Sequence, residues 1–316
     1  MKKYVFFTFI TSLVFLSSCT TSPLEEEVSQ EIPTSPVEQG LYNMSNWMGA
    51  LDETKSLTAL SIPGTHDSGA LHEPFFGTTV CQTLTIDEQL KAGVRYLDIR
   101  GRHIRNNFEI YHREVSQNLT FTDVLNSCKT FLSKNPSETI IMSLKEEYTA
   151  VENNRSYEAT FDLYTRTFPG LFYIGNTVPT LKEAKGKIVL LRRFAATNAK
   201  GIDATKWGDN TTFTITTTAQ TVRIQDQYIV PNNDAKWNLI KNLADEANTN
   251  NTHLYLNYCS GFKEDSFGTP YIRTVSDAIN PQVASYFTTN TKGHFGVIVM
   301  DFTSSTTNSL IVKTNF

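Results

Sequence analysis

The segment SIPGTHDSGA, residues 61–70, places a histidine and a carboxylate side by side just after an apolar run that ends at Ile62. The run is typical of a buried strand, and the Pro63-Gly64 pair predicts that the strand breaks there. Neighbouring side chains point to opposite faces of an extended strand. We therefore expect the break to let His66 and Asp67 both turn toward one functional site.

Apolar runs rich in β-branched residues recur along the rest of the chain. Dense runs of this kind are typical of parallel strands that are buried on both faces. The predicted strands are 58–62, 94–99, 108–111, 139–144, 187–191, 222–225, 253–258 and 295–300.

Apolar residues at helical spacing lie between several of these runs. They predict helices over 121–132, 157–168 and 237–247, and Pro281 is expected in the first turn of a fourth helix. The segments around 106–107 and over 200–218 are too irregular for helices. The chain is therefore expected to form a single α/β domain, a distorted or incomplete TIM (β/α)8 barrel.

Charged or titratable side chains follow almost every predicted strand. In chain order these strand-end residues are His66, Arg100, His112, Lys145, Arg193, Asp226, Tyr258 and Asp301. Loops are polar in any protein, but the strand C-termini of a (β/α) barrel converge on one face, where active sites are built. The set therefore favours one shared site over eight unrelated polar loops.

This set of residue types suits the cleavage of a phosphodiester without a metal. Arginine and lysine bind phosphate, and arginine does so with two parallel hydrogen bonds. Two histidines can serve as general base and general acid near neutral pH. A carboxylate beside each imidazole would fix its tautomer and stabilise its charged form.

Five segments in order resemble signatures of the bacterial phosphatidylinositol-specific phospholipase C family. They are SIPGTHDSG (61–69), DIRGR (98–102), NPSETIIMSLKEEY (135–148), GKIVLLRRF (186–194) and IQDQY (224–228). The resemblance runs from about residue 60 to residue 301. It implies a distorted TIM barrel that cleaves phosphatidylinositol, and possible action on glycosylphosphatidylinositol anchors stays open. The products would be diacylglycerol and inositol 1,2-cyclic phosphate, formed without a cofactor.

The resemblance also implies roles for individual residues. His66 matches the general base that deprotonates the inositol 2-hydroxyl, and Asp301 matches the carboxylate that orients this base. His112 matches the general acid, with Asp67 as its partner. Arg100 matches the residue that binds the phosphate oxygens and replaces the calcium ion of eukaryotic relatives. The inositol pocket would comprise Lys145, Arg193, Asp226 and Tyr228, and Asp98 would steady Arg100.

The chain departs from the family pattern near the general acid. The family has His-His-Gly where this chain has Tyr111-His112-Arg113, and placing His112 there requires a one-residue deletion in the 106–107 turn. Arg113 in place of glycine is expected to change the local loop and the access of the leaving group. Segment 259–271 also diverges, and Phe262 and Phe267 are candidates for insertion into a lipid surface.

The N-terminal 39 residues read as an export signal and a linker. Two lysines, an apolar run and Leu16-Ser17-Ser18-Cys19 predict a lipoprotein signal peptide over 1–18, with a lipid on Cys19. Residues 19–39 are rich in Ser, Thr, Pro and Glu and predict a disordered tether, so the catalytic barrel would span 40–316. We expect an exported bacterial lipoprotein, anchored in the outer membrane or at the cell surface.

Composition excludes some other classes of function. The net charge of −4 and the absence of a basic cluster argue against a nucleic-acid-binding protein. Without Cys19, the three remaining cysteines have no close spacing, which argues against disulfides and zinc sites. We expect a monomer that acts on phosphatidylinositol in membrane surfaces, without a metal. Two alternatives stay open: a metal-dependent glycerophosphodiester or sphingolipid phosphodiesterase, and a non-catalytic lipid- or sugar-binding surface lipoprotein.

Overall fold

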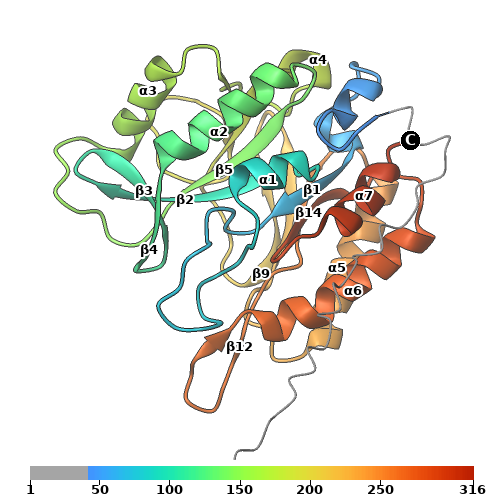
Figure 1. Cartoon of the computed structure of the whole chain (residues 1–316). Coiled ribbons are helices and arrows are strands. Elements are labelled where there is room, and N and C mark those ends of the chain that lie inside the picture. The colour runs from blue at the N-terminus through green and yellow to red at the C-terminus, as the bar shows by residue number, and fades with distance from the viewer. Residues whose placement is uncertain (1–41) are drawn as a thin grey trace, which may run out of the picture. The chain divides into compact units, whose positions relative to one another are not determined.

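A computed structural model describes residues 42–316, which belong to one compact unit. Its main strands are short apolar runs that pack on both faces, and they form a continuous parallel sheet (Figure 1). They are β1 (Ser61–Thr65), β2 (Tyr96–Ile104), β5 (Ile140–Glu146), β7 (Ile188–Arg192), β10 (Thr221–Asp226), β11 (Leu254–Tyr258) and β14 (Gly296–Met300).

Short strands complete the two ends of the sheet. The parallel pieces β6 (Phe172–Tyr173) and β8 (Ile202–Asp203) pair with β7, while β9 (Thr211–Thr216) pairs antiparallel with β10. The strand order is β6-β7-β5-β2-β1-β14-β11-β10-β9, and β6 and β9 at its two ends do not pair with each other. The sheet is therefore an open, incomplete barrel, as the sequence predicts.

Alternation along β7 explains why such a strand is apolar throughout. Val189 and Leu191 join the cluster inside the curved sheet. Ile188 and Leu190 join the cluster between the sheet and the two helices α2 (Phe121–Lys134) and α3 (Tyr157–Thr167). The helices cover the outside of the sheet (Figure 1). They are α1 (Ile86–Lys91), α2 (Phe121–Lys134), α3 (Tyr157–Thr167), α4 (Leu181–Ala184), α5 (Asn233–Thr249), α6 (Arg273–Thr289) and α7 (Ser305–Lys313), preceded by the short 3-10 turns η1 (Trp47–Ala50) and η2 (Leu57–Ala59).

The predicted break at Pro63-Gly64 is wrong, because both residues lie inside β1. Pro63 accepts a hydrogen bond from the Arg95 N–H, and Gly64 allows Tyr96 to pack against the strand: a Cβ at position 64 would lie 3.0 Å from the Tyr96 Cβ. The chain turns later, at Asp67, whose φ of 38° lies in the left-handed region that aspartate tolerates.

The predicted strand 108–111 exists, but it is not a barrel strand. It belongs to β3 (Asn107–His112), which pairs antiparallel with the far end of β2 and with β4 (Val115–Thr120). Arg105 and Asn106 both have positive φ and form the tight turn of this hairpin. His112 therefore reaches the site from a hairpin that extends β2.

Pro281 does not begin a helix. Helix α6 begins at Arg273, eight residues earlier, and Pro281 lies inside it. Proline lacks the N–H that would bond to the carbonyl of residue 277, so it costs the helix one bond. Buried Val275, Ile279 and Val283 lie on both sides of the proline, and their packing outweighs this cost.

The predicted signal peptide (1–18), the tether (19–39) and Cys19 lie outside the described residues. Within residues 42–316 no helix has the length and apolarity that crossing a membrane requires. Cys81, Cys128 and Cys259 are all free and buried, in agreement with the prediction that they form no disulfide.

Candidate active site

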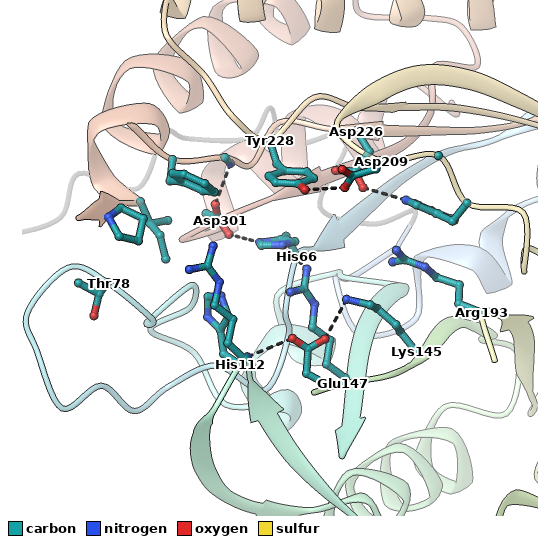
Figure 2. A pocket seen from close by; sticks show the side chains of 18 residues that line it. His66, Thr78, His112, Lys145, Glu147, Arg193, Asp209, Asp226, Tyr228 and Asp301 are labelled. Atoms are coloured by element: carbon teal, nitrogen blue, oxygen red, sulfur yellow. Dashed lines mark hydrogen bonds and ion pairs between the residues drawn. The ribbon is translucent and has the colours of Figure 1, made fainter. Parts of the chain in front are cut away.

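The carboxyl ends of the parallel strands open into one cavity of about 450 Å³ (Figure 2). Eight of the ten residues predicted for the site line it: His66, Arg100, His112, Lys145, Arg193, Asp226, Tyr228 and Asp301. The other two, Asp67 and Asp98, are fully buried behind the cavity wall and contact Arg100. Tyr258, which also ends a predicted strand, is buried and hydrogen-bonds to Tyr96 instead.

His66 and Asp301 form a tight pair at the ends of β1 and β14. The distance from His66 Nδ1 to Asp301 Oδ1 is 2.7 Å, and the Gly261 N–H lies 3.4 Å from the second carboxylate oxygen. Burial lowers the pKa of His66, but the Asp301 carboxylate more than offsets this effect, so the pKa lies above its ordinary value. The other ring nitrogen, Nε2, faces the cavity and lies 2.6 Å from an Arg100 nitrogen.

His112 lies on the other side of Arg100, and its main partner is a backbone carbonyl. Its Nδ1 is 2.7 Å from the Thr79 oxygen, whereas the expected partner Asp67 lies 3.5 Å away. Neither Asp67 oxygen has a hydrogen-bond partner among the described residues. Burial raises the pKa of Asp67 to about 7, while burial and the Arg100 charge lower the pKa of His112 to about 4. Burial therefore disfavours the charged form of both members of this pair in the free protein.

Arg100 lies at the centre of a buried charge network. Its guanidinium is 3.5 Å from both Asp67 and Asp98, and Asp98 is also 3.6 Å from Arg193 and accepts a hydrogen bond from Ser143. Burial would raise the pKa of Asp98, but Arg100 and Arg193 lower it to about 2. Asp98 therefore stays ionised between the two arginines.

The other half of the cavity is lined with polar and aromatic groups. The Trp207 ring donates to Asp226 over 2.9 Å and carries the Arg193 guanidinium on its face, 3.7 Å from the ring centre. The Tyr228 hydroxyl donates to Asp209 over 2.6 Å, a bond that raises the pKa of Tyr228 to about 12. Carboxylates, cations and an aromatic face together suit a ring that carries several hydroxyl groups.

Several lining residues escaped the sequence analysis. Trp207 and Asp209 lie in the irregular segment 200–218, where a tryptophan next to polar residues was the available signal. Glu147 accepts hydrogen bonds from Lys145 and from the backbone of Arg113. Thr78 and Ile272 lie in loops that carry no recognisable motif.

Arg113, the residue that replaces glycine, adopts a left-handed φ of 53° and lines the cavity beside His112. Its guanidinium lies 5.6 Å from the centre of the Phe262 ring. Phe262 itself forms part of the cavity wall and packs against the cluster of Ala70, Cys81 and Ile272. The structure therefore does not support the idea that Phe262 protrudes toward a lipid surface.

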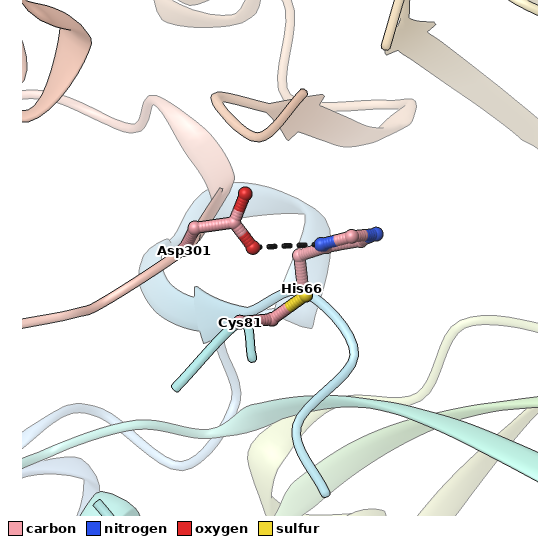
Figure 3. A group of neighbouring side chains, drawn as sticks. All are labelled: His66, Cys81 and Asp301. Atoms are coloured by element: carbon pink, nitrogen blue, oxygen red, sulfur yellow. Dashed lines mark hydrogen bonds and ion pairs between the residues drawn. The ribbon is translucent and has the colours of Figure 1, made fainter. Parts of the chain in front are cut away.

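Within residues 42–316, two groups of side chains could hold a metal ion by their donor types. They are His66, Cys81 and Asp301 (Figure 3), and Asp67, Cys81 and His112. Both sets consist of the acid–base residues plus one buried thiol, and both lie against Arg100, which contacts His66 and Asp67 directly. A cation bound there would be repelled by this guanidinium, so neither set fits a resident metal.

The open barrel, with two histidines on either side of an arginine and a buried aspartate near each histidine, defines an enzyme of the phosphodiester-cleaving class. Comparisons with known proteins agree with this class. Residues 54–194 match the family model "Phosphatidylinositol-specific phospholipase C, X domain". A 1-phosphatidylinositol phosphodiesterase of Staphylococcus aureus is 36% identical over 280 residues, covering 83% of this chain and 89% of that protein. Its counterpart from Listeria monocytogenes is 30% identical over 326 residues, covering 99% and 98%.

Solved structures give the same result. A mutant of the Staphylococcus aureus phosphatidylinositol-specific phospholipase C matches with a TM-score of 0.77 at 31% identity, over 87% of this chain and 98% of that one. The Listeria monocytogenes enzyme matches with a TM-score of 0.73 at 30% identity, over 87% and 100%. The chain belongs to the bacterial phosphatidylinositol-specific phospholipase C family. The predictions of family and of fold class are confirmed.

Proposed function

We propose that this protein cleaves phosphatidylinositol to diacylglycerol and inositol 1,2-cyclic phosphate by metal-independent acid–base catalysis, acting as a monomer on membrane surfaces. One observation carries the proposal: two histidines flank Arg100 in a single cavity, and each lies beside a buried carboxylate. The names of the Staphylococcus and Listeria relatives support the same substrate.

The reaction begins at His66. Asp301 accepts the Nδ1 proton, so the Nε2 lone pair faces the cavity. In the free protein this lone pair accepts from Arg100. When the lipid phosphate draws the Arg100 guanidinium onto its own oxygens, Nε2 becomes free to take the proton of the inositol 2-hydroxyl.

The 2-oxygen then attacks phosphorus and forms the cyclic diester, while the bond from phosphorus to the diacylglycerol oxygen breaks. When the substrate binds, His112 takes up a proton from solvent on Nε2 and then donates it to this leaving oxygen, while the Thr79 carbonyl keeps the proton on Nδ1. The phosphate charge beside Arg100 weakens the cationic influence that lowers the pKa of His112, and Asp67 supports the protonated ring. The proton lost from the inositol hydroxyl stays on His66.

The remaining cavity residues would hold the inositol ring. Asp226 and Arg193, both fixed by Trp207, and Lys145 can bind the ring hydroxyls, and the Tyr228 ring offers a face for stacking. Arg113 lies near His112, on the side from which the diacylglycerol departs in this scheme.

Phosphorus NMR of the products tests this function directly. Purified protein with phosphatidylinositol vesicles and excess EDTA should give the resonance of a five-membered cyclic phosphate. His66→Ala should lower the rate by at least about 10²-fold, the scale of one acid–base group, whereas His253→Ala, outside the cavity, should leave it unchanged. Loss of activity in EDTA that calcium or magnesium restores would favour a metal-dependent phosphodiesterase. No turnover at all would favour a lipid-binding protein.

We further propose that the protein is exported and tethered to a membrane through a lipid on Cys19, with residues 19–39 as a linker. The lipobox-like sequence Leu16-Ser17-Ser18-Cys19 supports this. Mass spectrometry of the membrane fraction should find a diacylglyceryl group on Cys19, and Cys19→Ser should release the protein from that fraction. A Cys19→Ser protein that stays membrane-bound after a high-salt wash would contradict the anchor.

A further inference from the structure

The segment 79–82 crosses the back of the cavity and contacts both histidine pairs. Gln82, which is 1% exposed, donates from its side-chain nitrogen to the carbonyl oxygens of His66 and Met300, each over 2.8 Å. The first carbonyl belongs to the base itself, and the second belongs to the residue before Asp301. One amide group thus joins the two strand ends that carry the His66–Asp301 pair.

Further hydrogen bonds hold the same segment in place. The Thr303 N–H lies 3.4 Å from the Gln82 side-chain oxygen, and the Phe302 N–H donates to the Cys81 carbonyl over 2.7 Å. The backbone N–H groups of Cys81 and Gln82 both donate to the Ala70 carbonyl, at 3.0 and 3.1 Å. These bonds tie the segment to the exits of β1 and β14 at once.

Thr79, three residues before Gln82 in the same segment, contacts His112. The Thr79 carbonyl accepts from Nδ1 over 2.7 Å, which places the bare Nε2 of the neutral ring toward the cavity. Between these two contacts the Cys81 thiol packs under His66 and Asp301 (Figure 3), and its sulfur lies 3.8 Å from His112 Nδ1.

We propose that residues 79–82 are a positioning strap for the acid–base pair. In this strap the Thr79 carbonyl fixes the tautomer of His112, and the Gln82 amide fixes the spacing between His66 and Asp301. The inference rests on the proposed catalytic roles of the two histidines. Gln82 is a positioning residue, because it contacts only the backbone of the residues that it places.

The amide of Gln82 can be removed with little change in side-chain size. Gln82→Met should lower kcat about ten- to a hundredfold and leave KM within twofold, because substrate contacts are untouched. His66 should also titrate at lower pH in an NMR experiment, because a looser contact with Asp301 raises its pKa less. The NMR titration does not depend on turnover, so it tests the strap even if the proposed reaction is wrong.

Asn315→Leu is the matched control. Asn315 donates to the Ser61 carbonyl and accepts from the Ser61 N–H, so it clamps the opposite end of the same strand, β1. It should lower Tm but leave kcat and the His66 titration unchanged. If Gln82→Met keeps wild-type kcat and His66 titration, or if Asn315→Leu shifts both equally, the role of Gln82 is overturned.

If the Gln82→Met protein fails to fold, a second variant and a second measurement still test the proposal. Gln82→Glu keeps the size of the side chain and the oxygen that lies near the Thr303 N–H. A protonated glutamate has one donor, so it can bond to only one of the two carbonyls. The kcat of Gln82→Glu should therefore lie between the values of the wild-type protein and of Gln82→Met. Wild-type kcat would contradict the need for two donors. For the Thr79 contact, nitrogen NMR of the wild-type protein should show neutral His112 with its proton on Nδ1. A proton on Nε2 instead would overturn the proposed role of the Thr79 carbonyl.

Discussion

At the scale of single residues, the contact between His66 and Asp301 sets the pH dependence of the reaction. The base acts only when neutral, and Asp301 raises its pKa, so the rate should fall as the pH drops through a value above that of an ordinary histidine. Asp301→Asn should move this acid limb of the kcat/KM profile to lower pH. It should also lower kcat by roughly 10²–10⁴-fold, because the imidazolium loses its carboxylate.

The control is Asp265→Asn, which should leave the pH profile unchanged. Asp265 is an exposed carboxylate in the loop between β12 (Lys263–Glu264) and β13 (Pro270–Tyr271). An acid limb that stays in place in Asp301→Asn would show that a different group titrates there.

The residues that were found from the sequence share a simple property: each follows a recognisable apolar run. His66, Arg100, Lys145 and Asp301 could be placed on one face because barrel topology brings strand ends together. Thr79 and Gln82 could not be found, because their function lies in a backbone carbonyl and in hydrogen bonds to backbone carbonyls. Neither contact leaves a pattern in the side-chain sequence.

At the scale of secondary-structure elements, a buried ion pair ties the first described segment to the sheet. Arg95, just before β2, and Glu138, just before β5, are both fully buried, and their side chains are 2.8 Å apart. Arg95 also donates to the carbonyls of Met44 and Ser45, and Glu138 accepts from the N–H of Met48 and of Gly49. Segment 44–49 therefore depends on this pair.

Glu138→Gln should lower the free energy of unfolding by about 3–5 kcal/mol, because it leaves the Arg95 charge buried without a partner. Calorimetry would measure the change, and kcat at low temperature should persist because the pair lies outside the active-site cavity. Arg105→Gln breaks an exposed ion pair with Glu152 and should change Tm far less. Equal losses in both variants would contradict this account.

Element boundaries were the least predictable part of the fold. Pro63-Gly64 and Pro281 are ordinary signals for a break and for a helix start, and both were overruled by packing. Gly64 makes room for Tyr96 within β1, and α6 buries apolar residues before and after its proline. Such contacts join segments that are distant in sequence, so a local pattern cannot report them.

At the scale of the whole molecule, exposed aromatic side chains lie in two segments that each contribute a residue, Thr78 or Pro270, to the cavity wall. Phe75, Phe76 and Phe267 are 75%, 85% and 93% exposed. Their loops touch, since the Ile272 N–H donates to the Gly77 carbonyl, and both lie at the lower side of Figure 1. We propose that these three rings enter the lipid surface, a role that was expected for Phe267 alone of the three.

Changing all three phenylalanines to serine should weaken binding to phosphatidylinositol-containing vesicles by at least tenfold in a sedimentation assay, because each ring loses apolar burial in lipid. Activity on a water-soluble substrate should survive. Leu163→Ser alters an exposed apolar residue on α3 and serves as the control. Unchanged vesicle binding in the triple variant would place the lipid contact elsewhere.

Overall architecture was predictable because an α/β barrel is specified by repeated strand and helix patterns. The openness of the barrel was also indicated, by the irregular segment 200–218 between two good strands. The antiparallel hairpin of β3 and β4 was not predictable, because an apolar run has the same pattern in a parallel and in an antiparallel strand.

The loop that carries Phe75 and Phe76 ends in the strap at Thr79, and Glu73 stiffens the path between them by accepting the N–H groups of Gly77, Thr78, Thr79 and Val80. The proposed lipid contact and the proposed alignment of the proton donor would therefore belong to one short peptide. Contact of Phe75 and Phe76 with a bilayer would then act on the position of the Thr79 carbonyl, and turnover per bound molecule should be higher on a membrane surface than in solution. The ratio of kcat on vesicles to kcat on a dispersed short-chain substrate should exceed one, and it should fall toward one when Phe75 and Phe76 are replaced by serine.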